Sequence, residues 1–369
     1  MRAGIPQGTT SQRNGNSLSV RNLFCLFPPC TIKSGIPTGL FTISAGEKPA
    51  SCDSCTYWPG FFEENSLKHA HNTFSYKALT TMTPASVTAF CPGHISGYFR
   101  RVDGRDLATT GSIGAGIVIN EGVTVTVSAA SSPSVTIRRQ DGTGAPSVLT
   151  HDSPPLFSAM GRLGVSAAVV TECRLPIGAG FGLSAAALLA SLTALDRLYG
   201  CGMDAHGIAT IAHETEVLHR TGLGDVAACQ SGGRVVRTGA GIDGHIERWF
   251  DLTESLYAIS FGPIHTPSVL GSPAQMDRVT RAFPRDSPDS IADFFRLSRE
   301  FADKSGLLTS EVRQVFGECD SADVPAGMTM LGNGVFAYGA RAGPVLRAFG
   351  EVYELHMAES GVRIVEEVP

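Results

Sequence analysis

The segment LPIGAGFGLSAAALLASLTALD, residues 175–196, combines three alternating glycines with a run that carries no charge before Asp196. Glycines let a backbone turn several N–H groups toward one anion, and a helix that follows adds the positive end of its dipole. The small residues Ala185 and Ala186 leave the approach to such an anion clear. The pattern therefore indicates a phosphate-binding loop that leads into a helix beginning at Ser184.

Other interpretations of this segment meet specific obstacles. A membrane span needs about twenty apolar residues in continuous helix, and Pro176 with the three glycines interrupts the first third of this one. A dinucleotide-binding turn needs a strand directly after its helix, whereas a second helix is predicted here. No Gly-Lys-Ser or Gly-Lys-Thr occurs in the chain, which excludes a Walker loop. When the motif is considered alone, a glycine-rich turn that packs in the core is the remaining alternative interpretation.

Three carboxylates downstream could serve phosphoryl transfer, which needs oxygen ligands for magnesium and a group near the acceptor hydroxyl. Glu214 and Glu216 lie about 200° apart around the second predicted helix, so they cannot share one face. Asp225 follows on the glycine-containing loop 221–224. Ser184 could offer its hydroxyl to a metal, although a serine there is also a common N-cap.

Two arginines of the segment GRVVRT, residues 233–238, could bind an anionic group of a substrate, because a guanidinium forms a planar fork that matches a carboxylate. Arg234 and Arg237 are three positions apart, so they lie on opposite faces of a strand. At most one of them enters a site.

The elements that position these residues are predicted from periodicity and capping. Ser184–Tyr199 is rich in Ala and Leu and is followed by Gly200, which indicates a helix. Asp204 is a suitable N-cap for a second helix from Ala205 to about Arg220. The segments 114–120 and 123–128 predict a hairpin of two strands, and His94 is expected to have a structural role in a turn at Pro92-Gly93.

Composition limits the protein class. A chain of 369 residues with 43% hydrophobic residues can bury a full core, and it most simply forms two domains with a boundary near 250, at residues 82–250 and 251–369. The net charge of -5 favours neither a nucleic acid nor an anionic membrane as a partner. Nine cysteines scattered in a chain without a secretory signal suit a reducing cytoplasm.

Residues 1–81 show no sustained period and are predicted to be a poorly ordered extension, with Met82 as the expected native start. This segment contains Cys52-x-x-Cys55, which could be half of a zinc site, but a second half with suitable spacing is missing from the sequence.

Several motifs together resemble one enzyme superfamily. Residues 176–186 read P-I-G-A-G-F-G-L-S-A-A and resemble the P-x-x-x-G-L-G-S-S-A-A phosphate loop of the GHMP small-molecule kinases. The segment FCPGHISGYF, residues 90–99, departs from the P-G-x-V-N-x-x-G-E-H motif of the superfamily and is similar to the P-G-H-I-[ST]-G-F-F opening of the archaeal pantoate kinases. The segments 111–116, 213–237 and 330–337 resemble the same subfamily, so the resemblance extends over about residues 82–369.

This resemblance implies an α+β protein with the two-domain GHMP kinase fold, in which a ribosomal-protein-like N-terminal domain holds the phosphate loop and the C-terminal domain is a ferredoxin-like sandwich. It implies ATP and Mg²⁺ as cofactors, and phosphorylation of pantoate on the archaeal route to coenzyme A. It allows a homodimer. A GHMP kinase for homoserine, shikimate or mevalonate, and a member that binds a ligand without catalysis, are the alternatives.

The resemblance also implies roles for individual residues. Asp225 corresponds to the catalytic aspartate, Ser184 and Glu216 to the metal ligands, and Ser112, His213 and Arg237 to the substrate-binding residues. Glu214 stays an alternative to Glu216. The residues implied to bind ATP are Pro176, Gly178, Ala179, Gly180, Phe181, Gly182, Leu183, Ser184, Ala185 and Ala186.

Overall fold

The computed structural model describes residues 84–141 and 145–369. The expected extension 1–81 and the Cys52–Cys55 pair lie outside these residues. Within them the chain builds two sheets and a set of helices, so the expected α+β content is confirmed. No helix of the described ranges has the length and apolarity needed to cross a bilayer.

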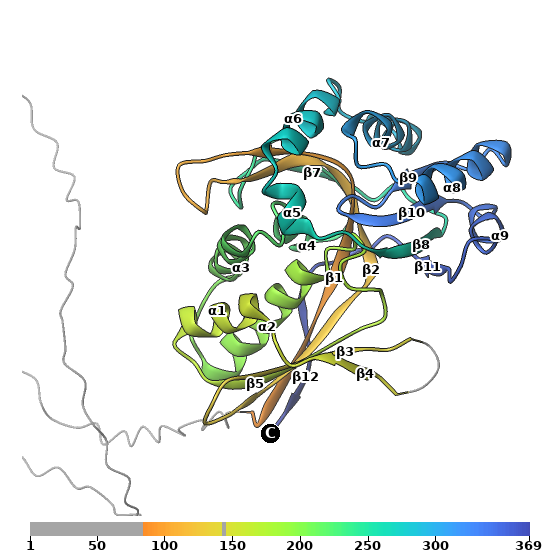
Figure 1. Cartoon of the computed structure of the whole chain (residues 1–369). Helices are drawn as coiled ribbons and strands as arrows, with labels where there is room; N and C mark the ends of the chain where they lie inside the picture. Colours follow the sequence, from red (N-terminus) through yellow and green to blue (C-terminus); the bar gives the residue numbers. More distant parts are fainter. Residues whose placement is uncertain (1–83, 142–144) are drawn as a thin grey trace, which may run out of the picture. The chain divides into compact units, whose positions relative to one another are not determined.

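The larger sheet has the strand order β12-β1-β2-β5-β3-β4, with β6 and β7 added beside β2. One edge of β2 has two neighbours in succession, since residues 114–117 pair with β6 and residues 123–129 pair with β5. Figure 1 shows the strands diverging around this point. The strands of this sheet are β1 (Ser86–Val102), β2 (Gly111–Ala129), β3 (Ser134–Arg139), β4 (Ser147–Thr150), β5 (Ala167–Cys173), β6 (Arg234–Arg237), β7 (Ile246–Trp249) and β12 (Arg363–Val368).

The predicted hairpin within residues 114–128 is wrong, because both segments belong to the single strand β2. Gly122 pairs with Pro92 and Ile119 pairs with Gly93, so a bulge absorbs the extra residues where a turn was expected. The predicted turn at Pro92-Gly93 is wrong for the same reason. β1 continues through it, and His94 lies in the strand opposite Val118.

The smaller sheet is antiparallel and has the order β11-β8-β10-β9. The chain passes from the larger sheet to this one between β7 and β8, and β12 then returns to pair with β1. The boundary predicted near residue 250 lies in this passage and stays a prediction. The strands are β8 (Leu256–Pro263), β9 (Ala326–Met328), β10 (Gly332–Tyr338) and β11 (Tyr353–Leu355).

Helices α1 to α3 lie together beside the larger sheet, with α2 packed on β1 and β2 (Figure 1). The two helices predicted after the glycine loop are confirmed as α2 and α3. The Asp204 side chain caps α3 by accepting a hydrogen bond from the Gly207 N–H at 2.7 Å. The helices are α1 (Pro154–Leu163), α2 (Leu183–Tyr199), α3 (Ala205–His219), α4 (Asp225–Cys229), α5 (Thr266–Leu270), α6 (Pro273–Ala282), α7 (Ile291–Ser305), α8 (Ser310–Ser321) and α9 (Ala342–Leu346).

Helix α7 contacts both β1 and β9 and thereby joins the two sheets. Its buried Phe301 ring lies 6.3 Å from the Tyr98 ring and 6.0 Å from the Phe99 ring, both on β1. On the same helix, Phe294 and Phe295 pack against Phe336 of β10. The apolar face of one helix therefore closes the core between the sheets.

Candidate active site

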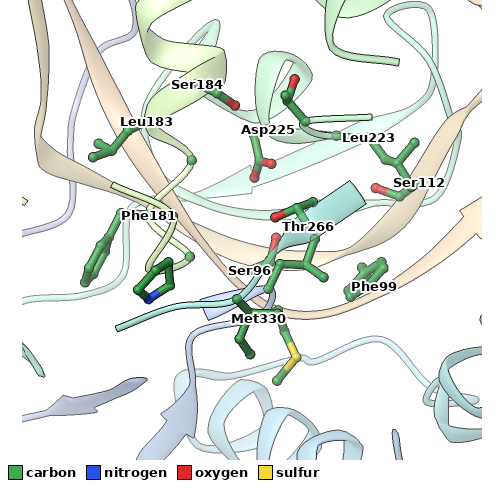
Figure 2. Close-up of a pocket in the computed structure, with 18 of the residues that line it drawn as sticks. Ser96, Phe99, Ser112, Phe181, Leu183, Ser184, Leu223, Asp225, Thr266 and Met330 are labelled. Carbon is green, nitrogen blue, oxygen red and sulfur yellow. The ribbon is translucent and has the colours of Figure 1, made fainter. Parts of the chain in front are cut away.

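A cavity of about 470 Å³ opens where the glycine loop, the start of α4 and the segment after β8 meet. Figure 2 shows Ser184 and Asp225 on one side of it, with Ser96 and Met330 opposite. The lining comes from Ser96, Phe99, Ser112, Thr221, Arg237 and the segments 177–178, 180–184, 223–225, 263–267 and 330–331. These positions are far apart in the sequence, so the site exists only once both sheets have formed.

The glycine loop has the backbone geometry that its sequence predicts. Gly178, Gly180 and Gly182 have φ values of 76°, 85° and 64°, a region that side chains with a Cβ rarely adopt. A Cβ on Gly180 would also lie 2.8 Å from the Met330 carbonyl oxygen. The glycines therefore allow both the turn and the close approach of the β9–β10 connection.

The N-terminus of α2 faces the cavity, because Gly182, Leu183 and Ser184 line it. Gly182 is the N-cap and no side chain caps this end, so its first N–H groups have no partner within the helix. Free donors and the helix dipole together favour an anion at this place. Ala179, Ala185 and Ala186 are buried behind it, and their small size permits this packing.

Glu216 and Glu214 leave opposite sides of α3, as their spacing predicts. Glu216 is buried, and its Oε1 accepts hydrogen bonds from the hydroxyl of Ser184 and from that of Thr221, the latter at 2.8 Å. Its Oε2 has no hydrogen-bond partner within residues 84–141 and 145–369. Glu214 instead forms a partly exposed ion pair with Arg162 of α1. Of the two glutamates, only Glu216 reaches the glycine loop.

Burial raises the pKa of Glu216 to about 7, and the charge of Asp225 adds to this effect, while the bonds from Ser184 and Thr221 oppose it. The carboxylate thus occupies a buried position with one oxygen unsatisfied among the described residues. A nearby cation would stabilise its charged form.

Asp225 begins α4 and opens on the cavity, with 23% of its side-chain surface exposed. His94 lies behind it, fully buried, and the His94 Nδ1 is 2.7 Å from the Asp225 Oδ1. Desolvation opposes ionisation of Asp225, but the hydrogen bond with His94 and the charge of Arg237 outweigh it and lower the pKa of Asp225. The carboxylate is therefore held ionised at the cavity wall.

Arg237 and Arg234 occupy opposite faces of β6. Arg237 lines the cavity, and its Nε and Nη1 are buried without a hydrogen-bond partner in the part of the chain that the structure describes. Arg234 is turned away, where it pairs with Asp251 at 2.6 Å and stacks on Trp249. Only Arg237 is free to bind a ligand in this cavity.

The glycines of the loop before Asp225 provide space for the charged groups. A Cβ on Gly222 would lie 1.9 Å from the Glu216 Oε2, and a Cβ on Gly224 would lie 2.1 Å from the Arg237 Nη1 and 2.5 Å from the Ser112 Oγ. Ser112 and Arg237 thus meet at one end of the cavity.

His213 is the one expected substrate-binding residue that does not line the cavity. It is buried, and its Nε2 is 2.8 Å from the carbonyl oxygen of Thr110. This contact lies on the backbone two residues before Ser112.

Several lining residues had no role in the sequence interpretation. Ser96 and Phe99 belong to the motif at residues 90–99, which indicates a subfamily but no role for either residue, and the proline-containing segment 263–267 has no functional signal of its own. Met330 belongs to the motif at residues 330–337, which resembles the pantoate kinase subfamily but indicates no role for this residue. Thr221 was recognised only as part of the loop that carries Asp225.

Comparison with known proteins agrees with this geometry. Residues 155–233 match the family model of the GHMP kinases N-terminal domain. The chain is 48% identical over 279 residues to the pantoate kinase of Methanospirillum hungatei, covering 76% of this chain and 96% of that protein. It is 30% identical over 273 residues to the pantoate kinase of Thermococcus kodakarensis, covering 68% and 87%.

Solved structures show the same fold. A phosphotransferase described as related to the coenzyme A biosynthesis pathway superimposes with a TM-score of 0.62 at 23% identity, covering 76% of this chain and 98% of that one. A mevalonate-3-kinase from Thermoplasma acidophilum gives 0.53 at 12% identity, covering 77% and 100%. The expected two-domain α+β fold is confirmed, and fold and site together define a GHMP kinase. Within that superfamily, the chain belongs to the pantoate kinase family.

Proposed function

We propose that this chain transfers the γ-phosphoryl group of ATP to the primary hydroxyl of pantoate, which yields 4-phosphopantoate for coenzyme A biosynthesis. The two similar archaeal proteins reported above are named pantoate kinases. The observation that carries the proposal is Arg237, a buried guanidinium with two unpaired nitrogens that lines the same cavity as Asp225 and the glycine loop.

The nucleotide phosphates are assigned to the glycine loop and the N-terminus of α2. The backbone N–H groups of residues 182–184 are free to donate there, and no bulky side chain obstructs the turn at Gly180. With this assignment the γ-phosphoryl group would lie in the part of the cavity that also contains Asp225.

Magnesium is assigned to Ser184 and Glu216. The unsatisfied Glu216 Oε2 and the raised pKa of this carboxyl fit a cation beside it. Within residues 84–141 and 145–369 no group of three or more His, Cys, Asp or Glu side chains forms a metal cage. Mg²⁺ typically takes one or two protein oxygens and fills its other positions with phosphates and water. When bound, it would neutralise charge that develops on the phosphates.

Pantoate combines a carboxylate, a hydroxyl and a carbon that bears two methyl groups. The carboxylate is assigned to Arg237 and Ser112, where an unpaired cation offers bidentate hydrogen bonds. The apolar side chains of Phe99, Leu223 and Met330 line the same cavity and suit the dimethyl carbon.

Asp225 would receive the primary hydroxyl. Because its pKa is lowered, the carboxylate is a weak base that orients the hydroxyl first and accepts its proton late. The hydroxyl oxygen forms a bond to the γ-phosphorus while the bond from that phosphorus to the β–γ bridging oxygen breaks, and ADP leaves.

A coupled assay of ADP release tests the assignment with ATP, Mg²⁺ and a panel of pantoate, homoserine, shikimate and mevalonate. We expect the highest kcat/KM with pantoate and no turnover without a divalent cation. A preference for any other alcohol of the panel would identify a different GHMP kinase.

A further inference from the structure

His94 connects the two halves of the site. His94 lies in β1 beyond Phe90, the last residue that pairs with β12, and its backbone N–H donates to the carbonyl oxygen of Phe181 in the glycine loop at 2.9 Å. Its side chain contacts Asp225 on the acceptor side at 2.7 Å. One buried residue thus contacts the loop assigned to the nucleotide and the carboxylate assigned to the acceptor.

Neighbouring glycines pack closely against the imidazole ring and the backbone of His94. A Cβ on Gly116 of β2 would lie 2.2 Å from the His94 Nε2, so the ring packs directly over this glycine. A Cβ on Gly182 would lie 3.1 Å from the His94 backbone nitrogen. The ring is fully buried. Among the described residues Asp225 is its one side-chain partner, since Nε2 has no hydrogen bond there.

The charges around the ring determine which nitrogen holds the proton. Burial lowers the pKa of His94, and the cations of Arg237 and Arg248 lower it further, while Asp225 acts in the opposite direction. An ionised Asp225 can only accept a hydrogen bond. A neutral ring with its proton on Nδ1 satisfies that contact, whereas a proton on Nε2 would place the Nδ1 lone pair against a carboxylate.

Helix α4 is also held at its other end. The Arg248 guanidinium donates to the carbonyl oxygens of Ala227, Ala228 and Gly232 at 2.8–2.9 Å, around the C-terminus of this short helix. The backbone of Asp225 is thereby placed by Arg248, and the remaining freedom is the rotation of its side chain.

We infer that His94 is a positioning residue, whose neutral imidazole donates from Nδ1 to Asp225 and holds that carboxylate in the orientation that receives the acceptor hydroxyl. The catalytic consequence rests on the proposed kinase function. The protonation state of His94 and its contact with Asp225 do not depend on that function.

Two substitutions separate the hydrogen bond from packing. His94→Phe preserves the ring and removes the donor, whereas His94→Asn removes the ring and preserves an N–H near the position of Nδ1. We expect His94→Phe to lower kcat by about 10- to 100-fold, with the KM for ATP changed less than threefold, and His94→Asn to recover most of the loss. A higher kcat for the Phe variant than for the Asn variant would show that the residue only fills space.

A double-mutant cycle tests the coupling. In an Asp225→Asn background, His94→Phe should lower the residual kcat less than twofold, because the group that His94 orients is already altered. An undiminished effect in that background would overturn the inference. Thr88→Val, in the same strand and away from the cavity, is the control and should leave kcat within twofold.

Nitrogen NMR of the protein labelled at histidine requires no substrate. We expect the His94 resonances of a neutral ring with the proton on Nδ1, assigned by their loss in His94→Phe. A proton on Nε2 or an imidazolium at neutral pH would overturn the inference. If this spectrum is as expected while no alcohol of the panel is phosphorylated, the proposed function fails and the contact stands.

Discussion

At the residue scale, the two arginines of β6 have different partners, so we expect their substitution to affect pantoate binding differently. Arg237→Ala removes the unpaired cation of the cavity, so we expect a loss of about 2–4 kcal/mol of binding and a KM for pantoate raised by a factor of tens to hundreds. Arg237→Lys should recover only part of it, since an ammonium lacks the planar fork. Steady-state kinetics with pantoate varied and ATP saturating measure this, and an unchanged KM would contradict the assignment.

Arg234 is no control for that experiment. Its side chain is fully buried, pairs with Asp251 and stacks on Trp249, so its removal leaves a cavity and breaks both contacts. Arg234→Ala is therefore expected to destabilise the fold, with little specific effect on pantoate.

The two glutamates of α3 form a matched pair for the metal. Glu216→Gln should raise the free Mg²⁺ concentration needed for half-maximal rate by at least about tenfold, because it removes a charged ligand beside Ser184. Glu214→Gln alters only the partly exposed pair with Arg162 and should leave this concentration within about twofold. The reverse pattern would exchange the roles of the two residues.

Glu216 also makes stability depend on pH when no metal is present. Its pKa of about 7 in the fold exceeds the ordinary 4.5, so the folded state binds the proton more tightly than the unfolded state does. The resulting stability, about 3 kcal/mol, is complete below pH 4.5 and is lost as the pH rises toward 7. Urea unfolding measured with a chelator present should therefore show that the free energy of unfolding of Glu216→Gln rises relative to that of the wild type between pH 5 and pH 8. A constant difference would contradict this.

At the scale of elements, the connection from the glycine loop to α2 is sensitive to an added methyl group. Gly180→Ala must adopt φ near 85° and approach the Met330 carbonyl, so we expect stability to fall by about 1–3 kcal/mol and ATP affinity by about tenfold. Gly161→Ala in α1 is the control, since nothing lies within 4 Å of its new methyl group. It should stabilise the helix by about 0.5–1 kcal/mol and leave ATP affinity unchanged, as calorimetry can measure.

At the scale of the whole molecule, α7 couples the two sheets, so the residues around them should unfold together. Phe301→Ala leaves a cavity against Tyr98 and Phe99, and we expect a loss of about 3–5 kcal/mol in one transition with an unchanged urea m-value. Phe250→Ala, at a ring that is 56% exposed, should cost less than about 0.5 kcal/mol. Separate transitions for the two sheets would show that α7 does not couple them. The expected homodimer stays a prediction that sedimentation can test.

The sequence by itself determined the parts of this protein that depend on neighbouring residues. The alternating glycines 178, 180 and 182 specify a turn with positive φ, Asp204 specifies a cap, and the spacing of Glu214 and Glu216 specifies that they diverge. The family motifs then indicated the superfamily, which the comparisons confirmed.

Only the tertiary structure decided which of these groups meet. Glu216 reaches Ser184 because α3 packs beside α2, and His94 reaches Asp225 across 131 positions because a bulge keeps β1 continuous where local residues predicted a turn. Phe99, Met330 and the segment 263–267 line one cavity because two sheets close around them. Local propensity describes a residue with its near neighbours, whereas contacts of this kind depend on the burial of whole faces, which no short segment specifies.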